Sequence, residues 1–201
     1  MKTLDILGSL TITLFAAWCI SEIVIGLISL RNRSRNLSDG ADRFSYFIVW
    51  FSTVPPIGFE YLIWAHPNLI HGFGSYPAFL SRLLGYLGCL AILFGITIRL
   101  IAVATLKRQF TLKVSIVEKH EIVDTSIYGI IRHPGYLGHL MSLLGIGLVL
   151  GNWVGLTMLV VLPLAGILYR IHVEEIALLH HFGQAYQAYR NRTKKLLPGI
   201  W

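Results

Sequence analysis

The sequence predicts an all-α integral membrane protein with five transmembrane helices. Of its 201 residues, 55% are hydrophobic and only 13% are charged, an apolar share well above that of a soluble domain. Several apolar runs reach the length of about 20 residues that crosses a bilayer. Most of the 17 Lys and Arg residues fall in alternate polar segments, a pattern typical of multi-pass membrane proteins. We expect one membrane domain, residues 1–201.

The first three predicted spans are residues 6–30, 44–65 and 79–104. The first is about 25 residues long, so we expect a retained helix and not a cleaved signal. Cys19 and Cys89 both lie inside apolar runs. The chain therefore has neither a disulfide framework nor a C-x-x-C metal pattern.

The apolar run from 136 to 172 is too long for one span and is predicted to form a helical hairpin. It is broken at Gly151-Asn152-Trp153, a turn signal with an interfacial aromatic residue. The predicted helices are residues 136–150 and 153–172. The stretches from Pro134 to Leu150 and from Trp153 to Arg170 are both about 17 residues, or about 25 Å, long, so the two cytosolic ends must meet.

A polar cluster is expected where these two ends meet. Its members are Arg132, His133, Tyr136, Arg170, Glu174 and Glu175. Arg170 and Glu174 are spaced i, i+4 and so share one helix face. Taken singly, Arg132 could be an ordinary positive-inside anchor, and Arg170 with Glu174 an ordinary solvated pair. Their convergence at one depth favours a binding site for an amphiphilic ligand.

The start of the fourth span is predicted to take part in this site. Pro134 suits the first turn, where its missing N–H is no loss. Free N–H groups are expected at Gly135, Tyr136 and Leu137, and with the positive end of the helix dipole they could hold a carboxylate. Gly138 leaves room for a ligand or a neighbouring helix to come close.

The distribution of Lys and Arg predicts the orientation in the membrane. Basic residues gather between spans 1 and 2, between spans 3 and 4, and after span 5. By the positive-inside rule these segments are cytosolic, so the amino end lies outside and the functional site faces the cytosol. The net charge of +7 suits contact with membrane lipids and calls for no nucleic acid partner.

The carboxyl-terminal segment, residues 174–201, is predicted to be a cytosolic amphipathic helix that continues from span 5 and is interrupted near Gly183. It could act as an interfacial anchor, as the wall of a site, or as both. Within the membrane, Glu22 and Arg99 are expected at matching depth, and buried charges at matching depth usually pair.

Two motifs in the second half of the chain are specific in combination. The first reads I-V-x-x-x-I-Y-x-x-x-R-H-P-x-Y-x-G and begins at Ile122. The second, R-x-x-x-E-E-x-x-L-x-x-x-F-G-x-x-Y-x-x-Y, begins at Arg170 and is followed by a terminal L-P. This order resembles the isoprenylcysteine carboxyl methyltransferase family, in its compact prokaryotic type, and in part the related membrane phospholipid methyltransferases. The resemblance covers about residues 105–201.

The resemblance implies methyl transfer from S-adenosylmethionine to the carboxylate of a lipid-like acceptor in the bilayer, such as a prenylated cysteine. It assigns cofactor binding and catalysis to residues 105–201. The three predicted transmembrane helices in residues 1–104 match the family only in being apolar. The implied cofactor-binding residues are Lys113, His120, Glu121, Ile122, Val123, Tyr128, His133, Pro134, Gly135, Tyr136 and Glu174. Arg170 is the implied catalytic residue and would bind the acceptor. In-line transfer from a sulfonium requires neither an enzyme nucleophile nor a metal, and a guanidinium suits an acceptor carboxylate.

Two other classes of function stay open at this point. A membrane reductase of the sterol-reductase kind, which uses NADPH, resembles this family in its carboxyl-terminal half. A channel or scaffold is less consistent with the sequence, because Glu22, Glu60 and Arg99 are spread over three spans without a repeated pore-lining pattern.

Overall fold

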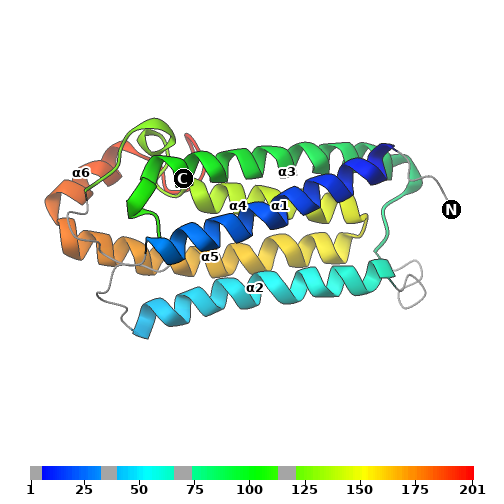
Figure 1. Cartoon of the computed structure of the whole chain (residues 1–201), viewed down its shortest axis with the longest axis horizontal. Helices are drawn as coiled ribbons and strands as arrows, with labels where there is room; N and C mark the ends of the chain where they lie inside the picture. Colours follow the sequence, from blue (N-terminus) through cyan, green and yellow to red (C-terminus); the bar gives the residue numbers. More distant parts are fainter. Residues whose placement is uncertain (1–5, 33–39, 66–73, 113–120) are drawn as a thin grey trace.

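The computed structural model describes residues 6–32, 40–65, 74–112 and 121–201, and these residues form a bundle of α-helices. The helices are α1 (Ile6–Arg31), α2 (Gly40–Ala65), α3 (Ala78–Leu106), α4 (Pro134–Leu150), α5 (Trp153–Phe182) and α6 (Gln184–Arg192). Two short 3-10 turns, η2 (Lys107–Gln109) and η3 (Ser126–Gly129), lie between α3 and α4. Figure 1 shows α1 to α5 lying along the long axis, with α6 at the end far from the amino terminus.

The order of packing differs from the order along the chain. α3 packs extensively on α4, and α4 packs on α5. α1 lies on α3, whereas α2 lies on α5. Consecutive helices α1 and α2 therefore have different main neighbours, and side chains from both can face a space between them.

Glycines allow α3 and α4 to approach closely. Gly88 and Gly95 on α3 face Gly145 and Gly138 on α4, and each pair is seven residues apart along its helix. A Cβ atom built on Gly138 would lie 2.6 Å from the Gly95 carbonyl oxygen, and one on Gly145 would lie 2.5 Å from that of Gly88. Small residues permit such backbone contact between membrane helices. Of the two roles that the sequence left open for Gly138, the structure places it against a helix.

The hairpin of α4 and α5 confirms the predicted turn. Gly151 ends α4 with φ of 80°, in the left-handed region that glycine adopts readily. Asn152 then caps α5, since its side-chain oxygen accepts from the backbone N–H of Val154 at 2.8 Å and of Gly155 at 3.2 Å. The bounds at Leu150 and Trp153 are those the sequence predicts.

The predicted helix beyond span 5 is in part α5 itself. α5 continues past residue 172 to Phe182, and Gly183, with φ of 54°, separates it from α6. The interruption expected near Gly183 is thus confirmed. Because α5 is long, it carries Arg170, Glu174 and Glu175 beyond its apolar segment to the level of the α4 start.

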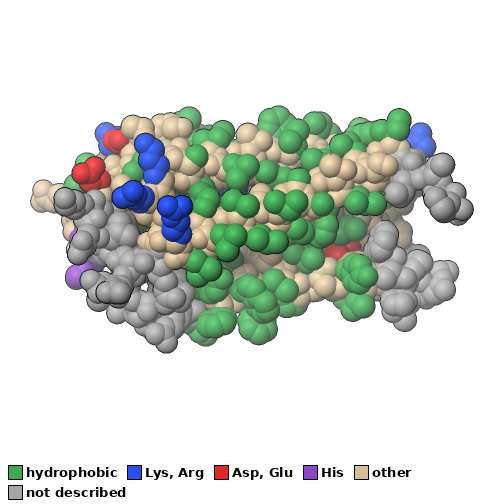
Figure 2. Space-filling view, viewed as in Figure 1, with side chains coloured by type: hydrophobic (Ala, Val, Ile, Leu, Met, Phe, Trp, Pro, Cys, Tyr) green, Lys and Arg blue, Asp and Glu red, His purple; other side chains and the backbone are tan. Residues whose placement is uncertain are grey.

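Within the described part of the chain, three helices are long and apolar enough to cross a membrane: α1, α5 and α3 with its η2 extension. α4 is apolar but has only 17 residues, and α2 contains Pro55, Pro56 and a buried Glu60. Five helices lie where five spans are predicted, while the number that cross the bilayer stays a prediction. Figure 2 shows apolar side chains over the middle of one face, and most of the visible Lys and Arg side chains near the α6 end.

Candidate active site

A pocket of about 530 Å³ lies at the α6 end of the bundle and extends between the helices. All six helices contribute to its wall, together with the segments 109–112 and 121–123. This volume is within the range of about 300 to 1,000 Å³ that small-molecule sites occupy. The pocket is therefore large enough for a cofactor or part of an acceptor.

Arg170 of α5 is held by groups from three distant parts of the chain. Its side chain is buried, with 3% of the residue exposed. The guanidinium donates to the Ser45 hydroxyl on α2, to the Leu112 carbonyl oxygen at 2.7 Å, and to the Tyr136 hydroxyl at 3.3 Å. These contacts fix the guanidinium plane in the pocket wall.

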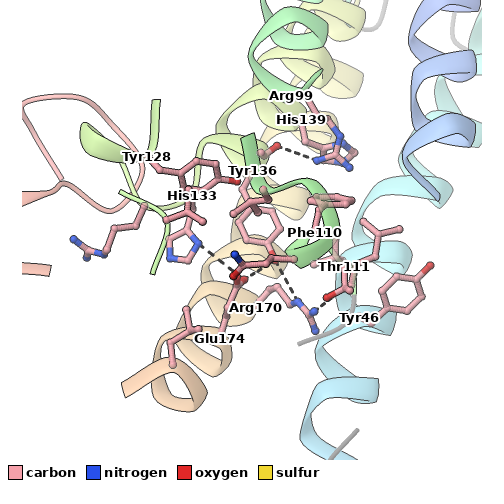
Figure 3. A pocket seen from close by; sticks show the side chains of 18 of the residues that line it. Tyr46, Arg99, Phe110, Thr111, Tyr128, His133, Tyr136, His139, Arg170 and Glu174 are labelled. Atoms are coloured by element: carbon pink, nitrogen blue, oxygen red, sulfur yellow. Dashed lines mark hydrogen bonds and ion pairs between the residues drawn. The ribbon is translucent and has the colours of Figure 1, made fainter. Parts of the chain in front are cut away.

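The Tyr136 hydroxyl connects Arg170 to Glu174. It accepts from the Arg170 Nε and donates to the Glu174 Oε2 at 2.9 Å. Figure 3 shows these three side chains in a row, with Tyr136 entering from α4 and the other two from α5. A permanent cation, a neutral hydroxyl and a carboxylate thus follow one another along the pocket wall.

A second set of polar side chains connects α6 to the start of α4. Arg132 Nε donates to Glu175 Oε1 at 2.8 Å, and the His133 Nε2 lies 3.4 Å from the same oxygen. The Arg132 guanidinium also donates to the carbonyl oxygen of Thr193 at 2.6 Å and to that of Arg190 at 3.2 Å. The two halves of the predicted cluster do meet, and Arg132 holds the end of α6 in place.

The start of α4 offers fewer free donors than the sequence suggests. Pro134 is in the first turn, as predicted. However, the N–H groups of Tyr136 and Leu137 both donate to the His133 carbonyl oxygen at 3.2 Å. The prediction that these two groups are free to hold a carboxylate is wrong, because His133 is the N-cap residue of α4 and its carbonyl oxygen accepts the first hydrogen bonds of the helix.

Most of the residues predicted for the site line this one pocket. They are Glu121, Ile122, Val123, Tyr128, His133, Gly135, Tyr136, Arg170 and Glu174. Pro134 is fully buried as the first residue of α4 and lies behind the wall. Lys113 and His120 fall outside the described residues.

α2 contributes to the pocket, which the sequence did not lead us to expect. Tyr46, Val49, Trp50 and Thr53 all line the pocket. Their spacing of i, i+3, i+4 and i+7 puts them on one helix face, and that regularity is visible in the sequence. The segment 109–112 had no comparable signal, because its place depends on tertiary contacts such as the bond from the Glu121 N–H to the Gln109 Oε1 at 3.1 Å.

Three tyrosines form the part of the wall nearest α6. Tyr189 donates to the Tyr128 carbonyl oxygen at 2.8 Å, which ties α6 to η3. Burial raises the pKa of the Tyr128 and Tyr186 phenols, so both stay neutral at physiological pH. The Tyr186 hydroxyl is buried and, among the described residues, has no hydrogen-bond partner. A buried hydroxyl in this state favours a ligand with a polar group beside it.

Comparison with known proteins gives matches over the same part of the chain. Residues 86–180 match the family model of the isoprenylcysteine carboxyl methyltransferase (ICMT) family. This segment runs from α3 through most of α5 and includes both polar groups at the hairpin ends.

Curated relatives match over part of their length. A probable protein-S-isoprenylcysteine O-methyltransferase of Oryza sativa subsp. indica is 30% identical over 117 residues, or 57% of this chain and 61% of the relative. The protein-S-isoprenylcysteine O-methyltransferase of Saccharomyces cerevisiae is 32% identical over 122 residues, or 60% of this chain and 51% of the relative. The matches thus span between half and two thirds of these relatives.

A solved structure shares the fold. The eukaryotic intramembrane Ras methyltransferase ICMT superposes with a TM-score of 0.56 at 20% sequence identity, covering 95% of this chain and 68% of that one. At this identity the likeness concerns the fold alone. The motifs, the segment matched by the family model and the fold all resemble the isoprenylcysteine carboxyl methyltransferase family.

Proposed function

We propose that this protein transfers a methyl group from S-adenosylmethionine to the carboxylate of a lipid-like acceptor in the membrane, such as a prenylated cysteine. The observation that carries the proposal is the row of Arg170, Tyr136 and Glu174 on the wall of one pocket. Both motif segments contribute to this row. The curated relatives named above are protein-S-isoprenylcysteine O-methyltransferases.

The residues near α6 fit S-adenosylmethionine. Aromatic faces attract cations, and Tyr128, Tyr186 and Tyr189 lie together in the wall with the Glu174 carboxylate close to Tyr136. The unpartnered Tyr186 hydroxyl offers a hydrogen bond to a polar ligand group. When bound here, the cofactor would supply an electrophilic methyl group on a positively charged sulfur.

The opposite part of the pocket fits a hydrocarbon chain. Ile23 of α1 and Val49, Trp50, Val54 and Ile57 of α2 line it. α1 packs on α3, and α2 packs on α5. The apolar side chains of α1 and α2 therefore line the pocket between the two helices. A lipid chain placed there would bring its polar end toward Arg170.

For this methyl transfer, the protein has to orient the two reactants and exclude water. An ionised acceptor carboxylate forms the new O–CH₃ bond while the S–CH₃ bond breaks, and the electron pair of that bond returns to sulfur. The carboxylate has no proton to lose, so no general base is required. Holding both reactants in line in a dry site provides most of the acceleration. The guanidinium of Arg170 is permanently charged and forked, which suits it to aim a carboxylate.

We infer that the site faces the cytosol. The pocket shares its end of the bundle with α6 and, among the described basic residues, with Arg31 at the end of α1 and Lys107 and Arg108 after α3. A soluble cofactor could enter from that side, while the acceptor enters from the bilayer. The five-span topology with the amino end outside belongs to this proposal.

Ligand-induced stabilisation of the purified protein separates this function from the NADPH-dependent alternative. S-Adenosylhomocysteine is expected to raise the thermal midpoint in a concentration-dependent way, because a ligand that binds only the folded state stabilises it by mass action. NADPH at equal concentration is expected to leave the midpoint unchanged. Stabilisation by NADPH alone would contradict the proposal. The family match already favours the methyltransferase.

A further inference from the structure

A polar niche lies deep in the same pocket, on the far side of Tyr136 from Arg170. Its centre is the ion pair of Glu22 and Arg99, with 2.6 Å between Glu22 Oε1 and Arg99 Nε, which confirms the pairing predicted from depth. His139 of α4 joins it, with Nδ1 at 3.5 Å from the same carboxylate oxygen. Figure 3 shows Arg99 and His139 together at this end of the pocket, away from Glu174.

Three buried polar groups of residues that line this pocket lack hydrogen-bond partners among the described residues. They are Nε1 of Trp18, Oγ1 of Thr53 and Nε2 of His139. The three residues are only 7%, 7% and 8% exposed, and all of them line the pocket. They come from α1, α2 and α4, so three separate helices contribute buried polar groups to the wall of one pocket.

The niche lies within reach of a chain whose polar end is at Arg170. His139 follows Gly135 by one helical turn, which corresponds to about 6 Å of depth. Gly135 itself is at the α4 start and accepts from the Arg99 guanidinium at 2.9 Å. The ring centroids of Trp18 and His139 are 6.3 Å apart, so Trp18 belongs to the same level.

The unpartnered atoms define the chemistry of the occupant. An indole N–H can only donate, whereas a threonine hydroxyl can donate or accept. A plain hydrocarbon chain satisfies none of these groups, and buried polar groups left unsatisfied disfavour the complex. An oxygen atom in the chain, as an ether, a ketone or a hydroxyl, could accept from both Trp18 and Thr53.

We propose that this niche binds an oxygen atom within the hydrocarbon chain of the methyl acceptor, and so selects an oxygenated lipid over a plain hydrocarbon one. The identity of the occupant as the acceptor rests on the proposed function. The niche adds a second polar contact to the one at Arg170. The niche would bind the hydrocarbon chain of the lipid, whereas Arg170 would bind its carboxylate.

A position scan along the chain tests the proposal. The probes are N-acetyl-S-dodecylcysteine and analogues in which one ether oxygen replaces a single methylene at successive positions. Their dissociation constants are measured by calorimetry with the full chain in lipid nanodiscs containing S-adenosylhomocysteine, and kcat/KM is measured separately with S-adenosylmethionine. We expect one position, or two adjacent ones, to bind about tenfold more tightly than the plain chain.

Matched variants show whether the niche causes the preference. Trp18→Phe keeps an aromatic ring but removes the N–H, and Thr53→Val keeps the shape but removes the hydroxyl. Each is expected to bring the ratio of oxygenated to plain affinity close to one. Thr157→Val, at an exposed threonine outside the pocket, is the control and should keep the full ratio.

The outcomes separate this proposal from the proposed function. Equal dissociation constants along the whole series would overturn the niche, which would then simply hold water. A preference that persists in both Trp18→Phe and Thr53→Val would overturn it as well. Position-dependent binding without methyl transfer would support the niche while contradicting the methyltransferase assignment.

Discussion

Arg170 has two roles: it holds the pocket wall together, and we propose that it binds the acceptor carboxylate. Its guanidinium reaches Ser45 on α2, the Leu112 carbonyl oxygen and Tyr136 on α4, so one planar group holds three parts of the pocket wall together. A lysine ammonium is a single point donor on a flexible stem and cannot reproduce this fork. The residue's identity, and not only its charge, should therefore matter.

Arg170→Lys is expected to lower kcat for methyl transfer about 100-fold, a loss typical of a reactant misplaced by an ångström. The affinity for S-adenosylhomocysteine, measured by calorimetry, should change little. Wild-type turnover in Arg170→Lys would show that charge alone is sufficient. A parallel loss of S-adenosylhomocysteine affinity would instead move Arg170 from the acceptor side to the cofactor side.

Glu174→Gln keeps the shape of the side chain and its contact with Tyr136 but removes the negative charge. Since hydrogen bonds to charged groups contribute about 1.5–3 kcal/mol, we expect about a tenfold or greater loss of S-adenosylhomocysteine affinity. Asp124→Asn is the matched control, because Asp124 pairs with Arg192 on the exposed surface outside the pocket. Equal affinities for wild type and both variants would remove Glu174 from the cofactor site.

Among the elements, the glycine contact between α3 and α4 determines how closely these two helices pack. Gly138→Ala is expected to destabilise the fold by about 1–3 kcal/mol, because the added Cβ would meet the Gly95 carbonyl oxygen at 2.6 Å. Gly58→Ala is the control, since a Cβ on Gly58 meets nothing within 4 Å. It should be neutral or stabilising by up to about 1 kcal/mol.

Reversible unfolding in mixed detergent micelles measures both glycine variants. A Gly138→Ala protein with unchanged stability but lost S-adenosylhomocysteine binding would return Gly138 to the role of a ligand contact. The same experiment distinguishes a general intolerance of the helices from the specific α3–α4 contact.

The elements also show why some of the site could be predicted and some could not. The hairpin of α4 and α5 follows from local signals, a glycine and an asparagine at the turn and two arms of equal length. These signals alone bring Tyr136 near Arg170 and Glu174. The Ser45 contact depends on α2 packing against α5, which no pattern within either helix specifies. The bonds at Tyr136 and Leu137 follow from where α4 begins. With Pro134 as its first residue, the His133 carbonyl oxygen accepts the first intrahelical bond, from Leu137, and a shorter-range bond from Tyr136.

In the whole molecule, the predicted topology requires the two ends of the bundle to lie on opposite sides of the membrane. α3 begins near Arg82 and ends at η2 beside the pocket, whereas Arg192 ends α6. With Cys19 and Cys89 replaced by alanine, a cysteine in Arg82→Cys should react with an impermeant maleimide from outside intact cells. A cysteine in Arg192→Cys should react only after the membrane is opened. Labelling of both from outside would contradict the predicted orientation.

The most direct test of the central claim is the chemical nature of the methylated product. The purified full chain is reconstituted with S-adenosylmethionine labelled in its methyl group, and with both N-acetyl-S-farnesylcysteine and phosphatidylethanolamine as candidate acceptors. A base-labile methyl ester on the cysteine carboxylate is the predicted result, because Arg170 is positioned to aim a carboxylate at the cofactor. Label found only as a base-stable methylamine on the phospholipid, or on neither acceptor, would contradict it.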